Sequence, residues 1–595
     1  MGRWTHTLRA AGWLALLALA LLLPATLLPG PAAAAGEGCP RCHRETPRFS
    51  AFHDPARIGC TSCHGGDPAA AEKAAAHAGL EAYPGRAATA ERRCGQSGCH
   101  AETVQRMRNS IMNTLAGMIE LTRDVLGEPP HAGQGLPLAQ RLVTSGADSY
   151  LRKLCVSCHL GNERRNHAQS LQDRGGGCSA CHLHTYPAPA DGGEAAPAPG
   201  AAQRAPARIH PTLTLRIPDE RCFGCHSRSS RVALNYVGLA EVDAPPPGSG
   251  GHGAELFDGR PVEARPPDLH STAGLSCVDC HTAAEVMGTG ESVTRLAQQL
   301  DVRCEDCHAP TLRERAVREL PVHERVAPTL SRWANPDLAR GVLVVTQRRG
   351  SALWNVFRQG GQALLRTKEA GKELPIPAVR PGRSHEMKGH ERLTCSACHD
   401  TWAPQCDGCH IAYDPAGQQW DHLLGRVTPG RWIERRWHVR NEAPALGVTG
   451  AGQIAPFVPG MSLIAELPGR PQALRSTRYT RVTPHTTQRA GRTCASCHRS
   501  EQALGVITGE AAAPWDSSLR VPIGWVARDA AQPGRGLRAG ERSLNAMERD
   551  RVRRVGDCLE CHGAASRLYD NFGAGLAAIA GQRPHPAPDS RAPAP

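Results

Sequence analysis

The pattern of apolar and polar residues is most distinctive near the start of the chain. Two arginines precede a nearly unbroken apolar run from Ala10 to Leu28, and the small residues Ala32 to Ala35 follow it. This order is typical of a Sec-type secretory signal peptide. We therefore expect residues 1–35 to direct export to the periplasm or the outer surface; an uncleaved membrane anchor is the alternative. No later segment is long and apolar enough to predict a stable membrane span.

Two further stretches show a clear periodicity. Apolar residues recur at helical spacing between Glu102 and Leu126, which predicts one amphipathic helix. Short apolar runs at 341–346, 351–357 and 362–367 are separated by glycine-containing turns. These runs predict a small β-meander insertion near 341–367.

The 24 cysteines follow one repeated pattern. Eleven C-x-x-C-H motifs and one longer variant, with four residues between its cysteines, use every cysteine of the chain. We number them motifs 1 to 12 in chain order. Their cysteine pairs are Cys39 and Cys42, Cys60 and Cys63, Cys94 and Cys99, Cys155 and Cys158, Cys178 and Cys181, Cys222 and Cys225, Cys277 and Cys280, Cys304 and Cys307, Cys395 and Cys398, Cys406 and Cys409, Cys494 and Cys497, and Cys558 and Cys561.

The spacing of each motif has a chemical reason. A helical turn places residues i and i+3 on one face, so both sulfurs can form thioether bonds to one porphyrin. The next residue, a histidine, then lies below the iron as its proximal ligand, which is the attachment signature of a c-type haem. Zinc sites and disulfides also use cysteine pairs, but neither requires a histidine after every second cysteine. We expect twelve covalently attached haems, with these proximal histidines: His43, His64, His100, His159, His182, His226, His281, His308, His399, His410, His498 and His562.

Histidines outside the motifs are candidate distal ligands, because electron-transfer haems usually hold a second axial side chain. The candidates are His53, His77, His131, His167, His184, His210, His270, His323, His385, His390, His422, His438 and His485. His252 and His585 lie in glycine-rich and proline-rich segments and are expected to be spectators. Met107, Met112 and Met118 are a weaker alternative, because an apolar stripe on a helix more often forms core. Mostly bis-histidine coordination is therefore predicted, and it implies low potentials.

The formal net charge of +13 does not by itself indicate a nucleic-acid partner. Each oxidised haem adds roughly one negative charge through its propionates, so twelve haems leave the protein close to neutral. Many arginines are then expected to pair with propionates.

Motif positions and low-complexity segments predict the domain organisation. Residues 187–207 are rich in Pro, Ala and Gly and predict a linker. The expected domains are a pentahaem domain at 36–186, a pentahaem domain with the β insertion at 208–412, a dihaem domain at 413–580 and a disordered tail at 581–595. We expect a mainly α and irregular, haem-packed fold with low regular secondary structure. Closely spaced motifs, such as motifs 1 and 2 or 9 and 10, suggest neighbouring haem couples.

With these motifs, the chain resembles the multihaem c-type cytochromes with doubled C-x-x-C-H motifs, and the block from Thr394 to His410 is typical of that group. The resemblance implies haem attachment at the motifs. The group is functionally mixed, so the resemblance implies neither a substrate nor an oligomeric state.

Two functions are compatible with the sequence. The first is electron transfer between periplasmic or extracellular redox partners in anaerobic respiration, with quinol-linked, periplasmic or outer-membrane cytochromes as partners. The second is an oxidoreductase that acts on a small nitrogen or sulfur oxyanion at one open-coordinated haem. Its candidate residues are Arg431, Arg435, His438 and His485, because cationic groups beside an open iron would hold an oxyanion. The surplus of histidines favours the electron carrier.

Overall fold

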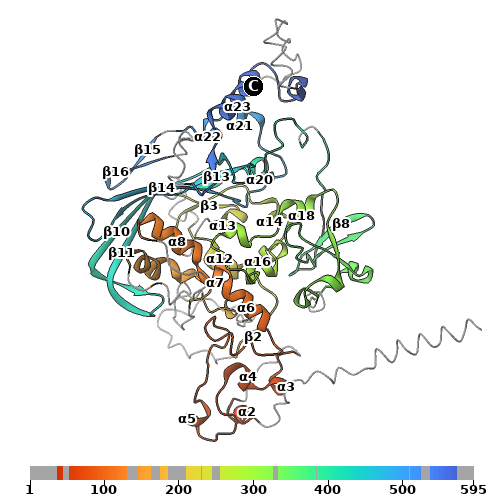
Figure 1. Cartoon of the computed structure of the whole chain (residues 1–595), viewed down its shortest axis with the longest axis vertical. Helices are drawn as coiled ribbons and strands as arrows, with labels where there is room; N and C mark the ends of the chain where they lie inside the picture. Colours follow the sequence, from red (N-terminus) through yellow and green to blue (C-terminus); the bar gives the residue numbers. More distant parts are fainter. Residues whose placement is uncertain are drawn as a thin grey trace, which may run out of the picture. The chain divides into compact units, whose positions relative to one another are not determined.

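The computed structural model describes most of the chain and places it in two compact units (Figure 1). Unit 1 comprises Met1–Ala101 and His182–Leu215, and unit 2 comprises Glu102–Cys181 and Arg216–Pro595. The described residues are 37–43, 52–129, 142, 145–162, 175–184, 210–228, 231–243, 255–256, 258–325, 333–382, 385–507, 509–523 and 537–571. The expected signal peptide, linker and tail lie outside them. No helix within these ranges has the length and apolar character that a bilayer crossing requires.

The described part of unit 1 contains four short helices, two of which, α2 and α4, coincide with a motif. Its helices are α2 (Cys39–Cys42), α3 (Pro55–Ile58), α4 (Cys60–His64) and α5 (Lys73–Ala76), and a short antiparallel pair joins β1 (Leu183–His184) to β2 (Thr212–Leu213). Side chains satisfy the free N–H groups at the helix starts. The Asp54 carboxylate accepts from the Ala56 N–H at 2.9 Å, and Glu37 accepts from the Cys60 N–H at 2.6 Å.

The predicted helix over 102–126 is interrupted twice in unit 2. It divides into α6 (Ala101–Asn109), α7 (Ile111–Thr114) and α8 (Ala116–Val125). Ser110 is extended, and Leu115 has a left-handed conformation with φ 56°. A Cβ on Gly117 would lie 2.2 Å from the Thr294 carbonyl oxygen, so the second break also permits a close backbone contact.

The main element of unit 2 is a six-stranded sheet in the order β11-β10-β13-β12-β17, with β14 paired to β13 (Figure 1). Its strands are β10 (Ala403–Asp421), β11 (Arg426–Glu442), β12 (Ala445–Val448), β13 (Ile454–Glu466), β14 (Leu474–Arg481) and β17 (Arg542–Ser543). The pairs are antiparallel except for β10 with β13, which are parallel.

Both faces of this sheet are covered. On one face, Cys409, Trp432 and Leu463 pack against Val125 and Leu126 at the end of α8. On the other face, Trp437 and Ile464 pack against Ala513 and Val521 of the hairpin β15 (Glu510–Ala513) and β16 (Asp516–Pro522). This burial of large apolar side chains makes the sheet an ordinary packed core.

The expectation of a mainly α and irregular fold with little regular structure is therefore wrong. Strands of 19, 17 and 13 residues form one mixed sheet. The reason is that this segment has its own apolar core, including Trp432 and Trp437, and does not depend on porphyrins for burial.

Smaller sheets surround the remaining motifs. β3 (Leu239–Glu241) pairs with β4 (Val262–Ala264), and β5 (Glu314–Ala316) pairs with β6 (Val342–Val344). β7 (Val356–Gln359), β8 (Gln362–Arg366) and β9 (Glu373–Pro375) form a three-stranded antiparallel sheet. Strands overlap all three predicted runs, but β7 begins only at the end of the second run. β6 pairs with β5, and β9 completes the three-stranded meander.

The other helices are short except α23, which has 13 residues. They are α10 (Gly146–Tyr150), a π-helical turn (Leu151–Cys155), a 3₁₀ turn (Val156–Cys158), α11 (Ser179–His182), α12 (Glu220–His226), α13 (Val232–Tyr236), α14 (Leu269–Ala273), α15 (Cys277–Cys280), α16 (Ala283–Met287), α17 (Leu296–Gln299), α18 (Cys304–His308), 3₁₀ turns at Val317–Glu319 and Pro336–Arg340, α20 (Cys395–His399), α21 (Cys494–His498), α22 (Glu501–Leu504), α23 (Ala546–Cys558) and a 3₁₀ turn at Arg567–Asn571.

Candidate haem-binding sites

Eleven of the motifs lie in helices or turns, as thioether attachment requires. In motif 1 the His43 N–H donates to the Cys39 carbonyl at 2.9 Å, and the same closing bond joins His281 to Cys277 at 3.0 Å. Motif 3 keeps this bond despite its longer loop, because the His100 N–H donates to the Cys94 carbonyl at 2.9 Å. The two extra residues therefore bulge out without changing how the motif closes.

The ring nitrogens of the proximal histidines are oriented by the chain. In five motifs Nδ1 lies 2.7 to 3.0 Å from a backbone carbonyl oxygen, to which it must donate. The pairs are His64 with Glu81, His182 with Thr214, His308 with Pro377, His399 with Gln488 and His498 with Val552. When Nδ1 carries the proton and donates it, the lone pair of Nε2 remains free to bind a metal.

Within the described part of the chain, seven proximal histidines face a histidine from the candidate distal set. Their ring centres are 5.7 to 6.3 Å apart. In unit 1 the pairs are His43 with His77, His100 with His53, and His64 with His210. In unit 2 they are His308 with His270, His281 with His485, His399 with His385, and His498 with His390.

This separation is the one that a shared iron requires. With a metal–nitrogen distance of about 2.0 Å on each side, and about 1 Å from each nitrogen to its ring centre, two trans imidazoles have centres about 6 Å apart. Burial also lowers the pKa of His53, His308 and His485, which favours the neutral ring that a metal needs. These seven sites therefore fit a six-coordinate haem held by two histidines.

Cysteines of different motifs also lie side by side. In unit 2 the thiols of Cys222 and Cys277 interact directly, as do those of Cys304 and Cys395. Cys280 interacts electrostatically with Cys307, and Cys398 with Cys497. The cysteines of motifs 6, 7, 8, 9 and 11 are therefore neighbours in that order, and porphyrins bonded to them would have adjacent edges.

Unit 1 has a similar succession. The sulfurs of Cys39 and Cys60 lie within 4.8 Å of one another, and Cys63 interacts electrostatically with Cys94 and Cys99. Motifs 1, 2 and 3 are therefore neighbours in space as well as in sequence.

Motif 10 does not fit the same attachment. It lies within β10, where Cys409 packs on the α8 face of the sheet together with Leu463. His410 pairs in register with Ile464, which belongs to the opposite face, and its Nε2 lies 3.0 Å from the Glu466 carboxylate. A cysteine and a histidine on opposite faces of a strand cannot hold the edge and the iron of one porphyrin. Motif 10 therefore lacks the ligand geometry of the other motifs.

Other candidate ligands have different surroundings. Arg106 donates to Nε2 of His323 at 2.9 Å, and the His323 Nδ1 lies 3.1 Å from Glu102, so both ring nitrogens are engaged. The backbone N–H of His422 donates to the Arg152 carbonyl at 3.0 Å, close to motif 4. His131, His167, His252 and His585 lie outside the described residues, as does the side chain of His184.

Comparisons of the chain with protein-family models, with curated proteins and with solved structures found no match. The interpretation of the motifs therefore depends on their residues and geometry.

Arginine side chains of strand β11 form ion pairs or pack against an aromatic ring. Arg436 lies 2.7 Å from Glu241, and Arg440 lies 2.7 Å from Asp407. Arg435 lies over the Trp515 ring at 5.5 Å, Arg431 is opposite Asp414 in the strand register, and the His438 Nδ1 lies 3.5 Å from Asp243. His485 faces His281. The residues proposed for an oxyanion site are thus not gathered around one free space.

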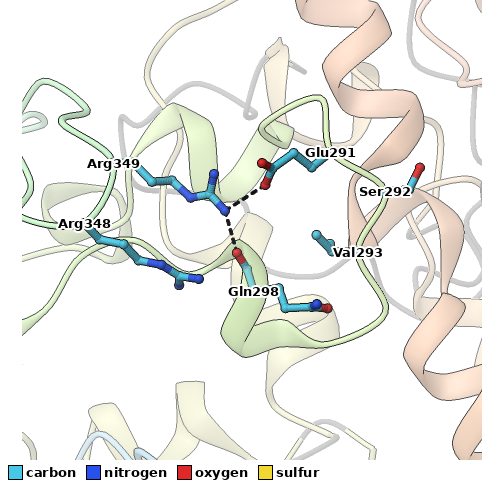
Figure 2. Close-up of a pocket in the computed structure, with 6 residues that line it drawn as sticks. All are labelled: Glu291, Ser292, Val293, Gln298, Arg348 and Arg349. Atoms are coloured by element: carbon cyan, nitrogen blue, oxygen red, sulfur yellow. Dashed lines mark hydrogen bonds and ion pairs between the residues drawn. The ribbon is translucent and has the colours of Figure 1, made fainter. Parts of the chain in front are cut away.

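Figure 2 shows a hollow in another part of unit 2, lined by Glu291, Ser292, Val293, Gln298, Arg348 and Arg349. Arg349 contacts the Glu291 carboxylate at 3.1 Å and the Gln298 carbonyl at 2.7 Å. Arg348 donates to the Ala297 carbonyl at 2.7 Å. Both guanidinium groups therefore have acceptors within the chain, and the lining contains neither cysteine nor histidine.

Two carboxylates that contact candidate axial histidines were not found from the sequence. Glu285 accepts from Nδ1 of the proximal His281, and Asp268 accepts from Nδ1 of the distal His270. The signal for Glu285 was present, because Thr282-Ala-Ala-Glu285 directly after motif 7 is a capping-box pattern.

Proposed function

We propose that this protein is an exported multihaem c-type cytochrome that transfers electrons between redox partners in anaerobic respiration. The seven proximal–distal histidine pairs carry the proposal, because their ring centres are 5.7 to 6.3 Å apart. Haem bound there would supply a one-electron Fe(III)/Fe(II) couple. An iron held by two histidines has no open position for a substrate, which suits electron transfer.

The succession of motifs supports the same function. Within unit 2, contacts between cysteines connect motifs 6, 7, 8, 9 and 11. Motif 12 is next to motif 11, since α23 supplies the Val552 carbonyl that binds Nδ1 of His498 at 2.9 Å. A continuous series of cofactors with adjacent edges is what a conduit needs. Quinol-linked, periplasmic or outer-membrane cytochromes are the proposed partners.

The alternative, an oxidoreductase for a nitrogen or sulfur oxyanion, has less support. Arg431 lies opposite Asp414 in the strand register, Arg435 lies over the Trp515 ring, and the His438 Nδ1 lies 3.5 Å from Asp243. His485 lies against His281.

An EPR spectrum of the purified, fully oxidised holoprotein tests the proposal. We expect low-spin ferric signals alone, unchanged by nitrite, sulfite or cyanide. A high-spin signal that one of these anions perturbs would instead identify an open haem and support the oxidoreductase.

A further inference from the structure

The axial histidine of motif 7 has a hydrogen-bond partner of a different kind from its neighbours. In motifs 8, 9 and 11 the proximal histidine donates to a backbone carbonyl. In motif 7, Nδ1 of His281 lies 2.8 Å from a carboxylate oxygen of Glu285. A carboxylate is a much stronger acceptor than a peptide carbonyl.

The local sequence explains the position of Glu285. Thr282 is the N-cap of α16, and Glu285 is the third residue of that helix, so the two form a reciprocal capping box. Glu285 is thereby fixed four residues after His281. Its side chain is 3% exposed, and the backbone N–H groups of Asp301 and Val302 also donate to it. Three N–H donors, from His281, Asp301 and Val302, therefore converge on Glu285, which is the environment of an ionised carboxylate.

Motif 8 has a matching feature on its distal side. His270, which faces His308, has its Nδ1 2.9 Å from Asp268. Asp268 is the N-cap of α14, its side chain is 3% exposed, and its second oxygen accepts from the Thr487 N–H at 2.9 Å. The carboxylate therefore cannot turn away from the ring.

These two sites are neighbours in the middle of the unit 2 series, because Cys280 interacts with Cys307. Asp219, Asp279 and Lys368 are further charged groups beside motif 7. None of them forms a hydrogen bond with the ring of His281 in the described contacts.

Building on the proposed function, we propose that Glu285 and Asp268 are positioning residues that give the haems of motifs 7 and 8 the lowest midpoint potentials in the unit 2 series. A carboxylate that accepts the Nδ1 proton makes the imidazole a stronger electron donor at Nε2. A stronger donor stabilises ferric iron over ferrous iron and so lowers the potential. Electrons would pass through these two sites without remaining on them.

Anaerobic redox titration of the holoprotein, followed by optical and EPR spectra, tests this inference. Glu285→Gln and Asp268→Asn should each raise the midpoint potential of one low-potential haem by about 59 mV. This shift corresponds to about a tenfold change in the one-electron reduction equilibrium of that haem. Asp337→Asn is the control, because Asp337 is a carboxylate with 1% exposure whose ion pair is with Arg340. This control should leave all components in place.

Two readouts separate the inference from the function on which it depends. The wild-type haem content and low-spin spectrum test the proposed cytochrome, and the shift between variants tests the role of the carboxylates. Unchanged potentials in both variants, with wild-type haem content, would overturn the inference. Because Glu285 also anchors two backbone N–H groups, Asp268→Asn provides the answer if Glu285→Gln does not fold.

Discussion

His485 illustrates how the fold orients a single candidate ligand toward a motif histidine. It has a left-handed backbone with φ 60°, a conformation that costs a non-glycine residue about 1 kcal/mol or more. Its Nδ1 donates to the Thr483 carbonyl at 2.9 Å, and its ring is nearly parallel to that of His281 at 6.2 Å. The strained backbone and the oriented ring are both explained if His485 is the distal ligand of motif 7.

Replacing His485 with alanine should therefore open one haem. We expect the EPR spectrum to show about one haem converted from low-spin to high-spin iron, because that haem would lose one strong axial ligand. His438→Ala is the matched control, since the nearest partner of its Nδ1 is Asp243 at 3.5 Å. A low-spin spectrum in His485→Ala, identical to that of the control, would contradict the assignment.

The sequence predicted which histidines would be proximal ligands. It could not show which candidate distal histidine faces which proximal histidine. His53 precedes motif 2 by seven residues, yet it faces His100 of motif 3. His270 similarly precedes motif 7 but faces His308 of motif 8, and His390 precedes motif 9 but faces His498 of motif 11. A distal ligand approaches the opposite side of the porphyrin, so the tertiary fold and not the local spacing selects it.

At the scale of elements, the sheet of unit 2 was missed because its central strand does not alternate. Residues 403–411 of β10 are buried almost without interruption, since both faces of the sheet are covered. Continuous burial of this kind is hard to distinguish from a helix by periodicity. The helix over 102–126 was found, but its two breaks depend on tertiary contacts such as the one between Gly117 and Thr294.

The packing of the sheet can be tested at Trp432. Its indole is 3% exposed, lies against Tyr150 and Tyr413, and donates to Ser149 at 3.1 Å. Trp432→Ala should reduce the free energy of unfolding by about 3–5 kcal/mol, because a large buried side chain leaves a cavity. Trp515→Ala should cost about 1 kcal/mol, since that side chain is 41% exposed. Urea denaturation measures both; equal losses would contradict the assigned core.

The start of α23, the helix that leads to motif 12, depends on a charged cap. Arg542 and then Arg392 hydrogen-bond Glu548, and despite partial burial they lower the pKa of that carboxyl from 4.5 to about 2. A lowered folded-state pKa stabilises the fold above pH 4.5, and this contribution disappears as the pH falls through about 2.

Glu548→Gln should therefore destabilise the protein at pH 7 by about 1 kcal/mol, a small value because the group is partly exposed. The difference from wild type should shrink at pH 3, as unfolding midpoints at the two pH values would show. A difference that stays constant between them would exclude this role for the carboxylate.

At the scale of the whole molecule, order along the chain and order in space diverge in unit 2. Motifs 9 and 10 are separated by the shortest spacing in the sequence, which suggested a haem couple. The cysteines of motif 9 instead neighbour those of motifs 8 and 11. Motif 10 has become part of the sheet, where Cys406 accepts a hydrogen bond from Arg231 at 3.2 Å. The local motif alone could not reveal this, because the strand is stabilised by partners far away in sequence.

The haem count follows from this arrangement. Attachment at motif 10 would require Cys409 and His410 to reach one porphyrin, and the paired strands β11 and β13 would have to release β10 for that to occur. We therefore expect intact-mass and pyridine haemochrome measurements to give eleven haems, and a Cys406→Ala/Cys409→Ala variant to give the same number. Twelve haems in the wild type and eleven in the variant would instead show that attachment at motif 10 outcompetes the sheet. The matched comparison is Cys494→Ala/Cys497→Ala, which should lose one haem, because motif 11 lies in the helix α21 and His498 faces His390.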